Sequence, residues 1–267
     1  MLKTSIIQFR PEFANVKANT LKVNGLLAAV KHSDLVVLPE LANTGYNFIS
    51  REQARSLAEP PENSAYVEML VHSAQKNKQL IVSGYHELEG DKLYNSSLLI
   101  SEDGLAGKYR KVHLFMNEKT IFEPGNLGFP VFQVKGIKLG MLICFDYLFV
   151  EAWRIMGLKG AEIIAHPSNL ITQNATKAIP AQAMINRFFI VTANRTGTER
   201  SITFNGRSFA VDPKGDYIAR IPDDKETIST FDINPETAHD KLITPLNHVF
   251  DDRFPGLYKE ILEKDLT

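Results

Sequence analysis

Runs of apolar and β-branched residues recur along the chain and predict the strands of a sheet. Several runs are continuous rather than alternating, which is typical of strands covered on both faces. The predicted strands are Thr4–Phe9, Leu35–Leu38, Leu80–Tyr85, Tyr94–Ile100, Ile137–Ile143, Glu162–Ala165, Phe189–Ala193 and Thr227–Ile233. Two shorter strands, Phe209–Val211 and Tyr217–Arg220, flank the sequence Asp212-Pro213-Lys214-Gly215, which is typical of a hairpin turn.

Segments with one apolar stripe separate these strands and predict helices that cover the sheet. Two of them carry apolar residues at i, i+3, i+4 and i+7, namely Val23, Leu26, Leu27, Val30 and Val67, Leu70, Val71, Ala74. Further helices are predicted over Phe149–Lys159 and Ala175–Arg187. In the second of these, Pro180 should lie in the first turn or mark a later start. The last residues, Leu257 to Leu266, are typical of a short helix and a polar tail.

The length of 267 residues suits one domain, and no repeat or linker divides the chain. We therefore expect a domain over residues 1–255, followed by the C-terminal helix and tail over 256–267. Lys and Arg number 30 against 31 Asp and Glu, so no basic excess favours a nucleic-acid partner. The sequence has no apolar run of membrane-spanning length and no signal-peptide pattern, and we expect a cytoplasmic protein without a membrane partner.

The single cysteine excludes an intramolecular disulfide and fits a reducing compartment. The seven histidines include no pair at metal-binding spacing, and no nucleotide-binding loop is present, so we expect no metal and no cofactor.

The segment Gly140-Met141-Leu142-Ile143-Cys144-Phe145-Asp146 is an apolar strand that ends in this cysteine, just before a helical pattern resumes. A strand-to-helix turn exposes the sulfur and aims backbone N–H groups at negative charge that develops beside it. This arrangement suits a nucleophile. The alternative is a buried, inert thiol that packs as a small apolar side chain.

Two other segments carry charged groups. The strand Leu35–Leu38 leads directly to Glu40, a position where α/β folds commonly place reacting residues, and a basic segment, Lys108 to His113, interrupts the chain of strands and contains Lys111. Taken alone, Glu40 could be an ordinary loop acid and the lysines a solvated basic face. A lysine beside a thiol and a carboxylate would favour the thiolate and neutralise an oxyanion.

Together these segments resemble the three motifs of the nitrilase superfamily of carbon-nitrogen hydrolases, in the same order. The motifs are Leu-Pro-Glu at Glu40, Tyr-Arg-Lys-Val-His-Leu at Lys111 and Gly-Met-Leu-Ile-Cys-Phe-Asp at Cys144. The resemblance continues through Phe122-Glu123-Pro124-Gly125, His166-Pro167-Ser168-Asn169 and Gly206-Arg207-Ser208, and so covers nearly the whole chain. It implies a single-domain α/β fold, a four-layer αββα sandwich, paired into a homodimer or a higher homo-oligomer.

The resemblance also implies roles for individual residues. Cys144 would be the nucleophile, Glu40 the general base, and Lys111 with the backbone N–H of Phe145 the oxyanion donors. A second glutamate, Glu118, would orient the substrate or hold Lys111, although neighbouring Glu123 could compete for this role. Our candidates for the substrate pocket are Asn43, Tyr46, Tyr147 and Asn169. Val150 and Ile185 replace residues common in the family, proline and glutamate, and could alter the interface or the pocket wall.

These expectations define a hydrolase that acts on a small molecule, most simply a short aliphatic primary amide, and releases ammonia. A nitrile could follow the same path through a thioimidate. An N-carbamoyl compound is a further alternative, although the run from Phe145 to Phe149 offers no base to bind a carboxylate. The non-enzyme alternative is an interaction protein that uses the same pocket for binding.

Overall fold

Two six-stranded sheets lie face to face at the centre of the computed structural model, which describes residues 1–222 and 224–263. In this part of the chain the first sheet has the order β14-β1-β2-β3-β4-β5 and the second β13-β12-β9-β8-β7-β6. The strands of the first sheet are β1 (Leu2–Gln8), β2 (Leu35–Val37), β3 (Leu80–Glu89), β4 (Lys92–Ser101), β5 (Gly104–Arg110) and β14 (Thr227–Ile233). Those of the second are β6 (Val131–Val134), β7 (Ile137–Met141), β8 (Ile163–Ser168), β9 (Phe189–Asn194), β12 (Phe209–Val211) and β13 (Tyr217–Arg220).

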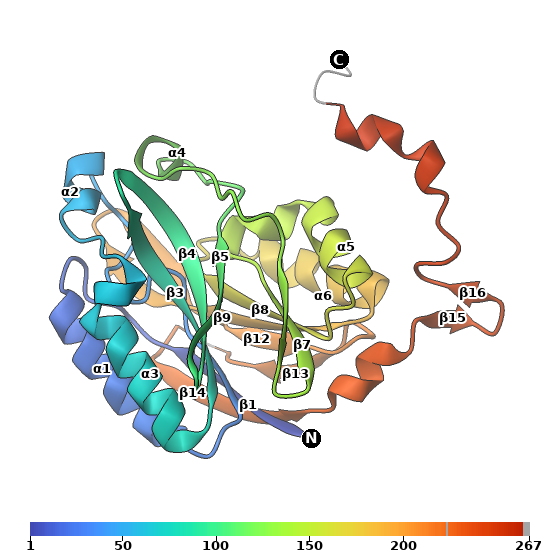
Figure 1. Ribbon diagram of the computed structural model, residues 1–267, viewed down its shortest axis with the longest axis horizontal. Coiled ribbons are helices and arrows are strands. Elements are labelled where there is room, and N and C mark those ends of the chain that lie inside the picture. Colours follow the sequence, from blue (N-terminus) through green and yellow to red (C-terminus); the bar gives the residue numbers. More distant parts are fainter. Residues whose placement is uncertain (223, 264–267) are drawn as a thin grey trace.

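Helices cover the outer face of each sheet (Figure 1). The first sheet is covered by α1 (Val16–Ala29) and α3 (Ala65–Asn77), and the second by α5 (Val150–Leu158) and α6 (Asn174–Asn186). The shorter helices are α2 (Arg51–Arg55) and α4 (Glu118–Ile121). The layers therefore run helix, sheet, sheet, helix, which confirms the single-domain α/β sandwich implied by the resemblance.

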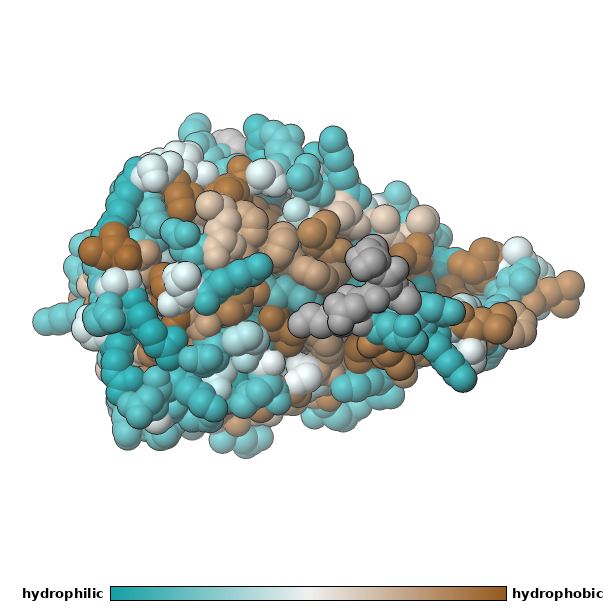
Figure 2. All heavy atoms as spheres, turned by 90° about the horizontal axis from the view of Figure 1, so that it is seen from above, coloured by the Kyte–Doolittle hydropathy of each residue, from teal (hydrophilic) through white to brown (hydrophobic). Residues whose placement is uncertain are grey.

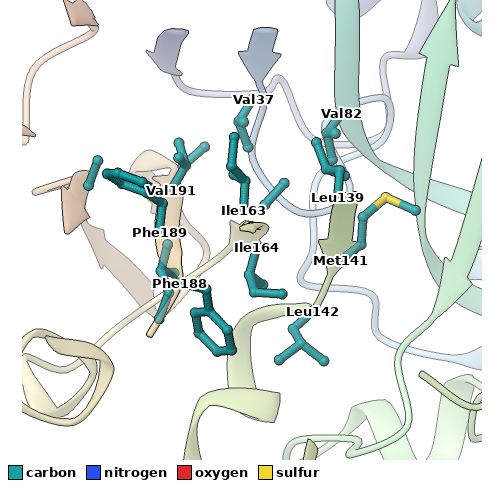
Figure 3. Packing of buried hydrophobic residues seen from close by; sticks show 14 of the residues in the cluster. Val37, Val82, Leu139, Met141, Leu142, Ile163, Ile164, Phe188, Phe189 and Val191 are labelled. Carbon is teal, nitrogen blue, oxygen red and sulfur yellow. The ribbon is translucent and has the colours of Figure 1, made fainter. Parts of the chain in front are cut away.

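The continuous apolar strands follow from this layering, because successive side chains enter different cores. In β2, Val36 packs under α1 and α3, whereas Val37 enters the core between the sheets. Figure 3 shows Val37 and Val82 of the first sheet opposite Leu139 and Ile163 of the second. Both faces of such a strand exclude water, so no polar residue interrupts the run.

Helix α6 differs from its prediction. It begins at Asn174 and runs through Pro180, which therefore lies in the helix interior rather than in the first turn or at a later start. Proline has no N–H to donate to the carbonyl four residues earlier, that of Thr176. The Tyr217 hydroxyl donates to this carbonyl instead. The contact from β13 supplies the hydrogen bond that the proline removes.

Several elements were not predicted. The basic residues Lys108 and Arg110 lie at the end of β5, rather than in an interruption between strands, because this part of the chain pairs antiparallel with β4. β6 and a separate hairpin, β10 (Thr196–Glu199) and β11 (Ile202–Asn205), are further additions. The hairpin turn at Asp212 to Gly215 is confirmed, with the Gly215 N–H donating to the Asp212 carbonyl at 2.9 Å.

The chain ends in a C-terminal arm, residues 240–263, which extends away from the sandwich (Figure 1). It contains β15 (Leu242–Thr244), β16 (Asn247–His248) and two 3₁₀ helices, Pro255–Leu257 and Lys259–Leu262. The predicted helix over Leu257 to Leu266 is thus replaced by 3₁₀ turns as far as Leu262, and its last residues, 264–266, lie outside the described part. None of the described helices is both long and apolar enough to cross a membrane.

Candidate active site

Cys144 occupies a strained turn three residues after the end of β7. It begins the 3₁₀ helix Cys144–Leu148 and has a backbone φ of +42°, a left-handed conformation that is costly for a residue with a side chain. The carboxylate of Asp146 restrains this turn. It accepts hydrogen bonds from the Ile143 N–H at 2.9 Å, the Tyr109 hydroxyl at 2.8 Å and His113 Nδ1 at 2.7 Å. The surrounding contacts thus hold the cysteine in a conformation that it would not adopt alone.

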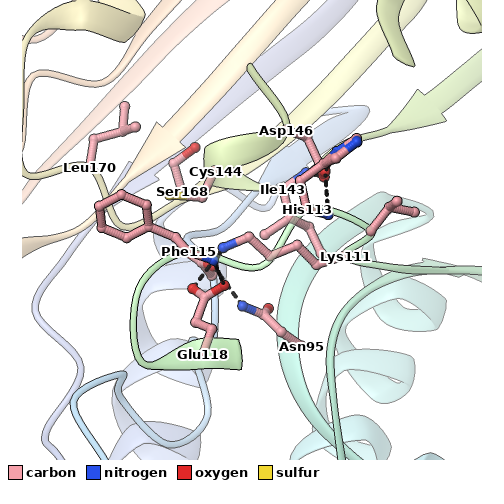
Figure 4. A network of polar contacts seen from close by, with 12 residues as sticks. Asn95, Lys111, His113, Phe115, Glu118, Ile143, Cys144, Asp146, Ser168 and Leu170 are labelled. Carbon is pink, nitrogen blue, oxygen red and sulfur yellow. Dashed lines mark hydrogen bonds and ion pairs between the residues drawn. The ribbon is translucent and has the colours of Figure 1, made fainter. Parts of the chain in front are cut away.

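A buried lysine lies between two buried carboxylates near this turn. Lys111 Nζ donates to Glu40 Oε1 and to Glu118 Oε1, both at 2.7 Å. Figure 4 shows the Lys111 side chain directed toward Glu118, next to Asn95. Asn95 Nδ2 also donates to Glu40 Oε1, at 2.7 Å, and Glu118 Oε2 accepts the Phe115 N–H at 2.9 Å. The structure therefore brings Glu40, Lys111 and Glu118 into one polar cluster.

Residues at one edge of the first sheet create this cluster. Glu40 follows β2, and Lys111 follows β5, where its N–H donates to the Asn95 carbonyl of β4 at 2.8 Å. Gly84 of β3 lies against the Glu40 backbone so closely that a Cβ atom there would come within 2.4 Å of Glu40 Cα. A side chain at position 84 would displace the carboxylate from the lysine.

The charges in the cluster shift one another's pKa values. Burial opposes the charge of Lys111, but Glu118 and Glu40 outweigh it and raise the pKa of this lysine, which stays an ammonium. Burial also raises the pKa of Glu118, to about 7, with the Glu40 charge adding to the effect and Lys111 opposing it. Burial and then the Glu40 charge raise the pKa of Cys144, against Lys111 and the Asn169 N–H. The resting cysteine is therefore a thiol.

A small cavity of about 30 Å³ adjoins the cluster. Its walls include Tyr46, Phe48, Phe115, Glu118, Asn169 and Ile202. Burial and the charges of Glu118, Glu40 and Cys144 raise the pKa of Tyr46, which keeps its hydroxyl neutral. The side-chain oxygen and nitrogen of Asn169 are buried and have no hydrogen-bond partner within the described residues. Asn169 thus presents a free donor and a free acceptor in the cavity wall.

Of the four residues suggested for the pocket, Tyr46 and Asn169 line this cavity. Tyr147 is buried beside Cys144, whose charge contributes to the raised pKa of Tyr147 after burial itself. Asn43 lies behind the wall, where its side-chain oxygen accepts the His86 N–H at 3.0 Å. The Phe145 ring packs against Phe115, with ring centroids 4.9 Å apart.

The structure also distinguishes the two glutamates that follow the lysine. Glu118 contacts Lys111, whereas Glu123 forms a half-exposed ion pair with Arg51 at 2.9 Å. Val150 and Ile185 are exposed on the outer surfaces of α5 and α6, so they belong to the molecular surface and not to the cavity wall.

Three residues that support the cluster or the turn at Cys144 were given no role in the sequence analysis. Asn95 contacts Glu40, Asp146 restrains the turn, and His166 Nε2 lies 3.0 Å from the Cys144 carbonyl oxygen. Asn95 did not stand out, because Ser96 and Ser97 follow it in the same predicted strand. His166 did carry a signal, because it is a polar residue that directly follows the apolar, strand-like run Ile163–Ala165. That pattern marks a buried polar side chain that needs a partner.

The sequence matches the family described as carbon-nitrogen hydrolase over residues 3–240. It is 39% identical over 260 residues to a nitrilase of Pyrococcus abyssi, covering 97% of this chain and 99% of the relative. It is 31% identical to an N-carbamoylputrescine amidase of Arabidopsis thaliana, covering 89% and 87%. The crystal structure of a carbon-nitrogen hydrolase from Helicobacter pylori superposes with a TM-score of 0.89 at 28% identity, over 98% of this chain and 99% of that one. The chain is therefore a hydrolase that belongs to the carbon-nitrogen hydrolase family, within the nitrilase superfamily.

Proposed function

We propose that the enzyme hydrolyses a small, uncharged aliphatic primary amide through a thioester on Cys144. The observation that carries this proposal is the unequal use of the two Glu40 oxygens. Oε1 is held by Lys111 and Asn95, whereas Oε2 is buried and has no partner within the described residues. A fixed carboxylate with one free oxygen near a protonated thiol is suited to act as a general base.

In the first half of the reaction, Glu40 takes the proton of the Cys144 thiol as sulfur attacks the amide carbonyl carbon. The Lys111 ammonium and the Phe145 N–H stabilise the tetrahedral oxyanion. The carbon-nitrogen bond then breaks, Glu40 donates its proton to the departing nitrogen, and ammonia leaves. The product of this step is a thioester between the substrate acyl group and Cys144.

In the second half, Glu40 removes a proton from water as the water oxygen attacks the thioester carbonyl. The carbon-sulfur bond breaks, and the proton returns to sulfur. The net reaction converts one amide and one water into a carboxylic acid and ammonia, with the thiol restored. Glu118 orients the substrate NH2 group and holds Lys111 between the two carboxylates.

The cavity supports a small and neutral substrate. Its volume of about 30 Å³ accommodates only a small group, and its walls carry aromatic rings together with the neutral amide of Asn169. None of the described wall residues is a lysine or arginine, which leaves a substrate carboxylate without a cationic partner. A short acyl chain fits this lining better than an amino acid derivative does.

We expect amides to be better substrates than nitriles of the same chain length. Glu118 can accept hydrogen bonds from an amide NH2 group, whereas a nitrile nitrogen has no hydrogen to donate. A panel of matched amides, nitriles and N-carbamoyl compounds, scored by ammonia release and kcat/KM, tests the proposal. A nitrile favoured by more than about tenfold, or ~1.4 kcal/mol, would reverse the assignment in favour of a nitrilase.

The raised pKa of Glu118 predicts the pH dependence of this reaction. As pH falls below about 7, Glu118 takes up a proton and loses its negative charge, so that it accepts less strongly from the substrate NH2 group and weakens its contact with Lys111. We therefore expect kcat/KM to fall on the acid side of neutral pH. The Glu118→Gln variant should show a low kcat/KM without that acid limb, measured between about pH 5.5 and 8.5. An unchanged acid limb in Glu118→Gln would assign the titration to another group.

We also propose that the enzyme is a homodimer that buries the outer face of α5 and α6. This face exposes Val150, Leu158, Met184 and Ile185, and the neighbouring C-terminal arm exposes Leu246 at 90%. Figure 2 shows apolar residues at the right-hand tip, where Figure 1 has β15 and β16. The outer face of α5 and α6 and the neighbouring C-terminal arm both expose apolar residues, and such a surface suits a self-complementary contact with a second copy of the chain.

The double variant Val150→Glu, Ile185→Glu should therefore shift the protein to monomers in light scattering. Leu21→Glu, at an apolar position on α1 that is more exposed than either of these, is the control and should leave the mass unchanged. A wild-type monomer at micromolar concentration would contradict the proposed dimer.

A further inference from the structure

A buried histidine contacts the backbone of the nucleophile. His166 Nε2 lies 3.0 Å from the carbonyl oxygen of Cys144. On its other side, His166 Nδ1 lies 3.2 Å from the Thr192 hydroxyl and 3.1 Å from the Ser168 hydroxyl. A carbonyl oxygen can only accept, so Nε2 carries the proton, and in the neutral ring Nδ1 accepts from the hydroxyls.

The topology of the second sheet brings this histidine to the turn. β7 and β8 are parallel neighbours, with Met141 paired to Ala165 and the Leu142 N–H donating to the Ala165 carbonyl at 3.1 Å. Cys144 comes three residues after β7 ends, and His166 directly follows Ala165 in β8. The two residues therefore meet at the same edge of the sheet, where the ring of Trp153 packs against the imidazole at 5.7 Å.

The carbonyl that His166 contacts belongs to the peptide unit whose N–H is that of Phe145. The described residues contain no cis peptide bond, so this unit is trans. In a trans peptide the C=O and N–H bonds point in opposite directions across one rigid plane. Holding the Cys144 oxygen therefore fixes the direction of the Phe145 N–H, which has no protein acceptor among the described residues.

We infer that His166 is a positioning residue that sets the oxyanion-binding direction of the Phe145 N–H through its hydrogen bond to the Cys144 carbonyl. The inference rests on the proposed roles of Cys144 and Phe145. The hydrogen bond from His166 also opposes relaxation of the strained turn, because Cys144 at φ +42° would relax by rotating this same peptide unit. A donor misaligned by such a rotation loses more of its stabilisation of the charged transition state than of its stabilisation of the bound, neutral substrate.

The surroundings keep His166 in the state that this role requires. Burial lowers the pKa of His166 to about 4, even though the Cys144 carbonyl and Asp146 act to raise it. The ring is therefore neutral at physiological pH, with a single proton to donate. It takes no part in proton transfer to the substrate, and its contribution is geometric.

Two amide substitutions separate the contact with Cys144 from the other contacts. In His166→Gln, the amide nitrogen can reach the position of Nε2 and should keep the hydrogen bond to the carbonyl. In His166→Asn, the shorter side chain reaches only the position of Nδ1 and keeps Thr192 and Ser168 as partners. We expect kcat for the amide to fall by roughly 10- to 100-fold in His166→Asn, with KM within about threefold, and to stay within about threefold of wild type in His166→Gln.

The rate at which iodoacetamide alkylates Cys144 distinguishes a general structural defect from the loss of an oxyanion donor. A structural defect would change this rate, whereas the loss of the donor would not. The reacting carbon of iodoacetamide is a CH2 group, so no oxyanion forms. The alkylation rate of His166→Asn should stay within about twofold of wild type. Parallel loss of alkylation and hydrolysis, or equal kcat in the Asn and Gln variants, would overturn the inference.

Nitrogen NMR of the wild-type imidazole tests the same contact without any variant. The inference requires the proton of His166 on Nε2, and a proton on Nδ1 would refute it even if both variants failed to fold. These outcomes are separate from the proposed function, whose failure would appear as turnover by a variant that lacks Cys144.

Discussion

The Cys144→Ala variant is expected to lose ammonia release by at least about 10⁵-fold, because it removes the atom that forms the thioester. The resting cysteine is a thiol, so its removal leaves no buried charge without a partner. The substitution also removes little volume. We therefore expect the free energy of unfolding to change by no more than about 1 kcal/mol, and the melting temperature to stay close to that of wild type.

Binding provides the control for this variant. Cys144→Ala retains the cavity wall and the cluster of Glu40, Lys111 and Glu118, and it should bind the preferred amide with nearly unchanged affinity in calorimetry. Loss of binding together with turnover would point to a damaged pocket. Full turnover by the folded variant would exclude Cys144 as the nucleophile and with it the thioester mechanism.

Much of the fold was predictable because burial determines both the apolar pattern and the layers. The strand predicted over Thr227–Ile233 coincides with β14, and the stripe from Val67 to Ala74 lies within α3, where it faces the sheet. β5 was missed for a physical reason. Its Arg110 is buried, paired with Glu87 and stacked over the Tyr94 ring at 3.8 Å. In the sequence a charged residue indicates exposure to solvent, but here contacts with residues distant in sequence compensate the charge and allow its burial.

The C-terminal arm shows the opposite case, in which apolar residues are exposed instead of buried. Its apolar residues, including Leu257 and Leu262, are exposed in the single chain, so an apolar pattern that predicts burial found no core here. A periodic apolar pattern indicates that one face of a segment is favoured to be buried. It does not indicate whether the same chain or another chain buries that face.

The residues of the candidate site also divide into those that the sequence could single out and those that it could not. Glu40 and Cys144 could be singled out because each follows a predicted strand, and Lys111 because it lies in a basic segment. The motifs of all three also resemble those of a known family. Their supporting residues could not be. Nothing in the sequence links Asn95 to Glu40 or His166 to Cys144, since each link depends on which strand ends are neighbours in a sheet. Periodicity predicts strands but not their order.

The Lys111→Ala variant is expected to lose activity by about 10³-fold or more, and for two reasons that add. It removes the cationic oxyanion donor, and it leaves Glu40 and Glu118 buried together without the ammonium between them. Glu118 should then take up a proton at neutral pH, because the Lys111 ammonium no longer lowers its pKa. Glu40 loses one of the two donors that hold its Oε1, so its free oxygen is no longer fixed for accepting the proton of the thiol.

The same loss should lower the free energy of unfolding by about 3 kcal/mol or more, since breaking a buried ion pair leaves an uncompensated charge. Activity must therefore be measured under conditions where circular dichroism shows Lys111→Ala to be folded. Lys108→Ala is the matched control. It removes a lysine three residues earlier whose partner Glu87 keeps its contact with Arg110, whereas Arg110 itself is too deeply buried to serve. Near-normal turnover by folded Lys111→Ala, or a comparable loss in Lys108→Ala, would mean that the essential lysine had been assigned to the wrong position.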